Sequence, residues 1–103
     1  MICNFNFNNN SYYSIRYSNE DQGYYYDYSG KLQGVDFDVG DSYPVKTYKH
    51  SYPSGKILSL SVYVSENECY VFSPDGALLS HWIGMNCYDI KGNIISTREE
   101  ITE

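Results

Sequence analysis

Helix-forming residues are scarce in this chain of 103 residues. Ala occurs once, at Ala77, and Leu occurs five times, whereas Tyr occurs 13 times beside many Val, Ile, Ser and Thr residues. Ala and Leu are among the best helix formers, and aromatic and β-branched residues favour strands, so this composition indicates a β protein. The chain is 42% hydrophobic, which is enough for a packed core and argues against disorder.

Features that would indicate secretion or a membrane span are missing as well. No apolar run approaches the roughly 18–20 residues of a membrane helix, and residues 1–6 lack the basic and apolar regions of a secretory signal. The three cysteines are too few, and odd in number, for a disulfide scaffold. We therefore expect a cytoplasmic protein with reduced thiols that does not associate with a membrane.

Basic residues are also in short supply. The chain has 13 acidic and 7 basic side chains, for a formal net charge of −6. Proteins that bind nucleic acid directly neutralise phosphates with Lys and Arg, so this balance argues against direct nucleic-acid binding.

Metal-binding motifs are absent, and we expect neither a metal nor another cofactor. The sequence has no CxxC, HExxH or EF-hand loop. The segment 36–41 offers three carboxylates, but an EF-hand loop requires Gly at its sixth position and Glu at its twelfth. Counted from Asp36, those positions hold Asp41 and Thr47. We interpret Asp36 and Asp38 as the solvated face of a strand.

Catalytic motifs are absent too, and we do not expect an enzyme. Neither His50 nor His81 lies in a recognisable nucleophile signature. An acid–base pair of these histidines could cleave RNA, but an acidic surface would repel that substrate. Cys69 and Cys87 lie in strand-like runs, so we predict that they are buried and act as small hydrophobic residues.

Alternating polar and apolar residues predict strands with one face in the core and one in water. In 34–39 the apolar residues Val35, Phe37 and Val39 alternate with Asp36 and Asp38, and the pattern places the apolar set in the core. In 56–64 the set Leu58, Leu60, Val62 and Val64 alternates with Ser59, Ser61 and Tyr63. The expected strands are 2–7, 11–17, 23–28, 31–39, 43–49, 56–64, 68–73, 77–83 and 86–96, the last broken by its own turn.

These strands predict an all-β fold, an antiparallel meander that forms a small barrel or a two-layer sandwich. A short helix hidden in the tyrosine-rich region would change the class to α+β. Residues 97–103 are too few for a stable helix, and we expect a frayed tail there. The whole chain, 1–103, is expected to form a single domain.

Four segments share one pattern: an aromatic residue, a short spacer with Gly, and an apolar strand start. Each Gly is placed where a tight turn needs a positive φ, and Ser-Pro-Asp-Gly at 73–76 is the strongest turn signal. The pattern resembles the hairpins of YD-repeat polymorphic-toxin shells and of small MORN-like antitoxins. The four segments are 26–32, 52–58, 72–78 and 88–94.

The profile of the whole chain resembles the immunity proteins that accompany bacterial toxins. These include the immunity proteins of contact-dependent growth inhibition and of nuclease bacteriocins. The shared features are a small, acidic, β-rich chain, rich in Asn, Tyr and Ser, without a catalytic constellation. The resemblance implies a bacterial protein that binds and neutralises a cognate toxin domain.

Acidic residues and tyrosines are concentrated together in residues 18–45. Carboxylates steer and pair with cationic partners, and tyrosine is enriched at interface hot spots. We therefore expect this segment to cover a cationic nuclease toxin, although the tyrosines could instead fill the core while the acids confer solubility. Two alternatives stay open: a phage-type nucleic-acid mimic that inhibits a host defence protein, and a carbohydrate- or ligand-binding β module. The expected contacts are Glu20, Asp21, Tyr25, Asp27, Asp36, Asp38 and Asp41.

Overall fold

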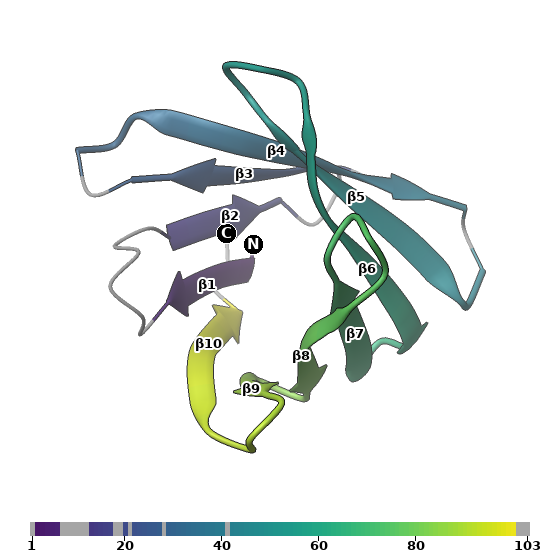
Figure 1. The fold of residues 1–103 in the computed structure, drawn as a ribbon. Coiled ribbons are helices and arrows are strands. Elements are labelled where there is room, and N and C mark those ends of the chain that lie inside the picture. The colour runs from purple at the N-terminus through teal and green to yellow at the C-terminus, as the bar shows by residue number, and fades with distance from the viewer. Residues whose placement is uncertain are drawn as a thin grey trace.

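The described part of the chain folds into ten antiparallel strands that follow one another around a closed barrel (Figure 1). This computed structural model describes the backbone of residues 2–6 and residues 13–17, 20, 22–27, 29–40 and 42–100 in full. Each strand pairs with its neighbours in sequence, and β1 also pairs with β10. The strands are β1 (Ile2–Asn6), β2 (Tyr13–Arg16), β3 (Gln22–Tyr26), β4 (Leu32–Val39), β5 (Val45–Ser51), β6 (Ile57–Ser65), β7 (Glu68–Phe72), β8 (Leu78–Ile83), β9 (Asn86–Asp89) and β10 (Ile94–Glu100).

The predicted all-β meander is confirmed, in its barrel form. Within the described ranges there is no helix, and hence none long and apolar enough to span a bilayer. The expected frayed tail is wrong for residues 97–100, because they continue β10 and pair with β1. Thr97, for example, lies opposite Phe5, and Glu100 lies opposite Ile2. Pairing with a strand at the other end of the sequence orders this segment, which no local pattern could indicate. Residues 101–103 lie outside the described residues.

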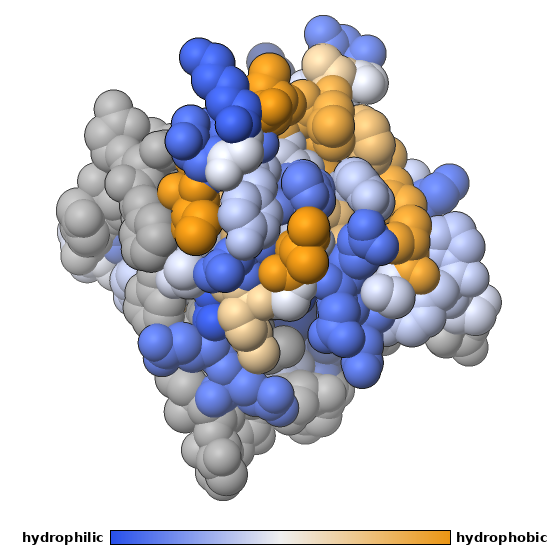
Figure 2. Space-filling view, turned by 90° about the horizontal axis from the view of Figure 1, so that it is seen from below, coloured by the Kyte–Doolittle hydropathy of each residue, from blue (hydrophilic) through white to orange (hydrophobic). Residues whose placement is uncertain are grey.

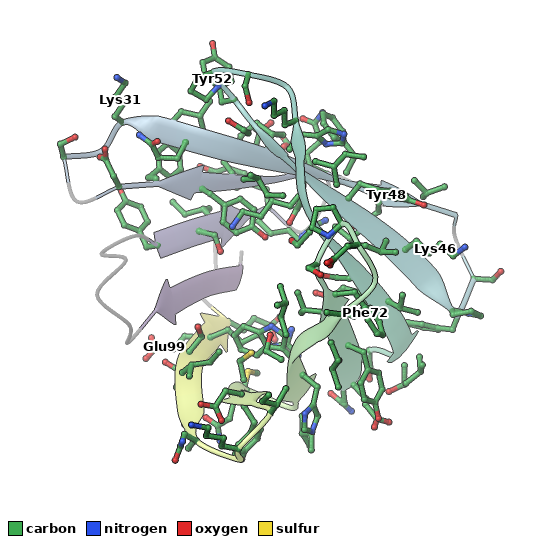
Figure 3. The ribbon with its side chains drawn as sticks, viewed as in Figure 1. Lys31, Lys46, Tyr48, Tyr52, Phe72 and Glu99 are labelled. Carbon is green, nitrogen blue, oxygen red and sulfur yellow. The ribbon has the colours of Figure 1, made fainter. Side chains whose placement is uncertain are left out.

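Alternating strand direction gives the barrel two distinct ends. The turn end carries the connections within the hairpins β3–β4, β5–β6, β7–β8 and β9–β10, at residues 27–31, 52–56, 73–77 and 90–93. The loop end carries the connections between hairpins, at 17–21, 40–44, 66–67 and 84–85. Figure 3 shows Lys31 and Tyr52 of the turn end at the upper left. Lys46 lies on the right, near the start of β5 at the loop end.

The four segments that share a sequence pattern are the four turns at the turn end. In the β3–β4 turn the Asp27 amide donates to the Lys31 carbonyl and the Gly30 amide to the Asp27 carbonyl, both at 3.0 Å. The same two bonds recur in 73–77 and 89–93, and the β5–β6 turn is one residue longer. Gly30 has a φ of 84°, in the left-handed region that only Gly adopts readily.

A β-bulge follows each of these four turns at the same position. The extra residue is Gln33, Leu58, Leu79 or Ile95, because the residues on either side of it pair with consecutive residues of the preceding strand. The next residue, on the face that points into the barrel, is small in every hairpin. These small inward residues are Gly34, Ser59, Ser80 and Ser96.

The interior of the barrel is more polar than the alternation predicted. Asp36 is only 5% exposed, whereas its neighbour Phe37 is 40% exposed. The prediction that Val35, Phe37 and Val39 face the core is therefore wrong, since that face points outward. The apolar set of 56–64 is reversed in the same way, with Leu58 and Val64 exposed. The most buried side chains of the described part are Ser14, Asp36, Thr47, Cys69, Ser80 and Cys87.

Candidate functional site

A charged cluster inside the barrel joins strands β2 and β4 across β3. The Arg16 guanidinium forms an ion pair with Asp36, and its Nη1 donates to Asp38 Oδ2 at 3.0 Å. Thr47 on β5 donates its hydroxyl to the other Asp38 oxygen at 2.7 Å. Burial alone would lower the pKa of Arg16, but the charges of Asp36 and Asp38 raise it overall. The two carboxylates thus hold the guanidinium charged in a partly buried position.

Gly23 makes this ion pair possible. It lies between Arg16 and Asp36 in the same cross-strand row of β2, β3 and β4. A Cβ atom at Gly23 would lie 2.6 Å from Asp36 Oδ1, so any larger residue would collide with the carboxylate that Arg16 binds. The missing side chain therefore leaves the space through which Arg16 reaches over β3.

Tyr25 completes the cluster from β3. Its hydroxyl donates to Asp36 Oδ2 at 2.6 Å, and the Lys49 Nζ atom lies 3.9 Å from its ring centroid. Burial, reinforced by the negative charge of Asp36, raises the pKa of Tyr25 well above its usual value. Asp36 thus accepts bonds from both Arg16 and Tyr25, so the cluster supplies its own partners and serves to hold the barrel together.

Of the seven expected contact residues, three lie in the interior. Asp36, Asp38 and Tyr25 belong to the cluster with Arg16, so the interpretation of the two carboxylates as a solvated face is wrong. Tyr25 was expected at the contact surface, but its side chain points into the barrel, where its hydroxyl donates to Asp36. Arg16 decides the inward placement of the two carboxylates: it precedes Asp36 by 20 residues and Asp38 by 22, and it draws both into the barrel.

The other expected contacts lie elsewhere. Glu20 is exposed at the loop end. Asp27 is bound into its own turn, where its Oδ1 accepts from the amides of Ser29 and Lys31 at 2.9 and 3.0 Å. Asp21 and Asp41 lie outside the described residues. The five expected residues that the structure describes therefore do not form one face.

The loop end instead gathers exposed apolar and aromatic side chains from four separate connections. Their exposed fractions run from 41% for Tyr17 to 55% for Tyr43. Each lies at a strand end or in a connection, where the alternation of a strand gives no information about exposure. Sequence reasoning missed them for that reason. The set is Tyr17, Val39, Tyr43, Val64, Ile83 and Met85.

Acidic side chains accompany this apolar set. Glu20 and Glu66 are exposed in the connections, and β10 ends at the same end with exposed Glu99 and Glu100. Among the described residues near this end, Lys46 is an exposed basic side chain. Two further bases point inward: Arg16 binds the cluster, and Arg98 donates its Nε to the Gly84 carbonyl at 2.9 Å while stacking over Trp82. Internal pairing of these arginines leaves the loop end acidic.

The outer surface carries a row of aromatic rings across β7, β8 and β9. His81 lies between Tyr70 and Tyr88, with ring centroids 5.6 and 5.8 Å away, and is nearly parallel to the Tyr70 ring. The Tyr70 hydroxyl donates to Glu68 at 2.6 Å, and this bond raises its pKa. Figure 2, seen from below, shows hydrophobic residues on that face in several patches among hydrophilic ones. The outside of the barrel is thus a mixed surface, as protein interfaces are.

Groups with nucleophilic or metal-binding chemistry are dispersed in the described part of the chain. No three His, Cys, Asp or Glu side chains there could hold a metal ion together. Cys69 and Cys87 are buried free thiols, as predicted, and burial raises the pKa of Cys69 to about 11. His50 is packed edge-on against Phe37, with a buried Nδ1 atom that has no hydrogen-bond partner. No protein family, curated protein or solved structure matches this chain.

Proposed function

We propose that this chain is a non-catalytic inhibitor of the immunity type, which neutralises a cationic protein toxin by docking its loop end on the toxin. The observation that carries the proposal is the composition of that end. Exposed apolar and aromatic side chains from four connections lie there with exposed carboxylates, while two nearby arginines are turned inward. Several exposed apolar side chains beside polar ones at one end of a barrel are a candidate protein-binding surface.

The mechanism is stoichiometric occlusion. Glu20 and Glu66 attract a basic partner and speed association, because unlike charges steer diffusional encounter. Tyr17, Tyr43 and Met85 then supply area that is removed from water in the complex. A nuclease toxin fits this chemistry because its substrate groove presents cations to phosphates. Asp36 and Asp38 no longer belong to the contact surface in this proposal and instead support the barrel that carries it.

The two alternatives have less physical support. A nucleic-acid mimic needs a dense array of exposed carboxylates, and Asp36 and Asp38 are paired with Arg16 in the interior. A carbohydrate module needs free aromatic faces. The row of Tyr70, His81 and Tyr88 is the best candidate, but Tyr70 and His81 stack with each other, which covers one broad face of each ring.

Co-expression tests the proposal directly. The protein encoded immediately upstream is produced with and without this chain in a sensitive bacterial strain, and the purified pair is examined by pull-down. We expect growth protection and a stoichiometric complex that forms more slowly at high salt. A protein that neither binds its neighbour nor protects the strain would contradict the proposed function.

The absence of catalysis is tested with the histidines. His50→Ala and His81→Ala are expected to protect the strain as well as the natural sequence does, when the variants are present at equal levels. If protection is lost in either folded variant, and if the natural sequence protects when it is present in less than a stoichiometric amount relative to the toxin, the chain acts by turnover and the occlusion mechanism is wrong.

A further inference from the structure

The turn end has a second exposed apolar surface, and the repeated hairpin generates it. In β6, β8 and β10 the strand begins with an apolar residue that points outward just after the turn: Ile57, Leu78 and Ile94. The bulge residues Leu58 and Leu79 add to it. Ile90, the most exposed of the set at 74%, and Tyr52 project from the turns themselves. Three consecutive hairpins therefore present the same apolar chemistry at the same height on the barrel.

The charges at the turn end differ from those at the loop end. The described turns carry three carboxylates and three lysines: the β5–β6 turn has a single lysine, the β7–β8 turn a single aspartate, and the other two turns one charge of each sign. The three carboxylates also accept hydrogen bonds within their own turns; Asp89 Oδ1, for example, accepts from the amides of Lys91 and Asn93, both at 2.9 Å. These charged residues are Asp27, Lys31, Lys56, Asp75, Asp89 and Lys91.

We propose that the turn end of hairpins β5–β6, β7–β8 and β9–β10 is a self-association surface, on which two copies of this chain dock end to end. The distribution of charges on the turn end indicates that its partner is a second copy of the chain. A two-fold axis that passes between hairpins β5–β6 and β7–β8 places Lys56 of each copy opposite Asp75 of the other, so unlike charges meet at the centre of the interface. Two loop ends, by contrast, would repel each other because both are acidic. A strongly cationic partner would gain nothing from the balanced turn end.

End-to-end docking leaves both loop ends directed away from the interface. The dimer would therefore offer two independent docking surfaces to the proposed toxin, one at each end. The self-association surface does not depend on the proposed function, because no loop-end residue contributes to it.

The test uses the full chain and measures mass in solution. Sedimentation equilibrium over a wide concentration range should give a mass that rises with concentration to twice the 11.9 kDa of one chain. Leu79→Lys and Ile90→Lys each place a charge in the apolar contact and are expected to weaken dimerisation about tenfold or more. Both side chains are exposed in the monomer, so at concentrations too low for dimerisation the variants should unfold at the same temperature as the natural sequence.

Met85→Lys at the loop end is the matched control, because Met85 is exposed to a similar extent, 51% against 46% for Leu79. It should leave the dimer intact. A chain that stays monomeric at every concentration would overturn the proposal, and so would a dimer that Met85→Lys disrupts as much as Leu79→Lys does. Binding of the monomer to phosphatidylcholine vesicles or to the toxin through Leu79 would assign the surface to another occupant and would overturn it equally.

Discussion

Asp36 and Phe37 are consecutive residues of β4, yet the charged side chain is enclosed in the barrel and the aromatic one is 40% exposed. This arrangement is possible because Arg16 forms an ion pair with Asp36 inside the barrel. Gly23 has no side chain and leaves the space for that pair. An enclosed carboxylate without that partner would be strongly destabilising. The polar interior in turn leaves apolar side chains for the surface, where they are available for binding.

Asp36→Asn should destabilise the fold. The change keeps the size of the side chain but removes the charge that pairs with Arg16, whose guanidinium would remain partly buried. We expect a loss of about 3 kcal/mol in the free energy of unfolding, measured by denaturant titration at pH 7. The exposed Glu20→Gln is the matched control and should change stability by less than about 0.5 kcal/mol. Equal stabilities of the two variants would contradict the assigned role of the cluster.

Gly23→Ala should disturb the same cluster through shape alone. The added methyl would lie 2.6 Å from Asp36 Oδ1 and would force the carboxylate away from Arg16. We expect a destabilisation of about 2 kcal/mol. In a double-mutant cycle with Asp36→Ala, which removes the colliding group, the cost of Gly23→Ala should fall by more than about 0.5 kcal/mol. Additive effects would show that Gly23 has another role.

The enclosed tyrosines predict a loss of stability in alkali. Burial raises the pKa of both Tyr25 and Tyr63, so the unfolded chain releases their protons at a lower pH than the folded chain. Their contribution is fully present below the unfolded pKa of about 10 and is lost as the pH rises from there towards the folded values. Each tyrosine should steepen the fall in the free energy of unfolding by at most about 1.4 kcal/mol per pH unit.

Denaturant unfolding between pH 9 and pH 11 measures this slope. Tyr25→Phe should start from a lower stability at pH 7, because it removes the hydrogen bond to Asp36, and should then lose stability less steeply in alkali. A slope that Tyr25→Phe leaves unchanged would mean that this hydroxyl titrates equally in both states.

The sequence was sufficient for the antiparallel meander, because turns and alternation are local, but it left the choice between a barrel and a sandwich open. Ser-Pro-Asp-Gly at 73–76 and the three related segments all form the hairpin turns they predict, and the strand between 77 and 83 was correctly located. The single long pattern 86–96 also divided at its own turn, into β9 and β10.

Local patterns could not decide which face of a strand is the inner one. Alternation shows that Asp36 shares a face with Asp38, but the side on which that face lies depends on Arg16, which is 20 residues away. The continuation of β10 through residues 97–100 depends similarly on β1 at the other end of the chain. The loop-end set, including Tyr43 and Met85, was missed because barrel closure brings together connections that have no common sequence signal.

Pairwise comparison of two lysine substitutions tests the central claim, that the loop end is the docking surface. The dissociation constant of the complex with the upstream-encoded toxin is measured for Met85→Lys and for Leu79→Lys, which add the same charge at sites of similar exposure on opposite ends. We predict that Met85→Lys weakens binding about tenfold or more and that Leu79→Lys leaves it within about twofold. A greater loss for Leu79→Lys, or unchanged binding for Met85→Lys, would contradict the account.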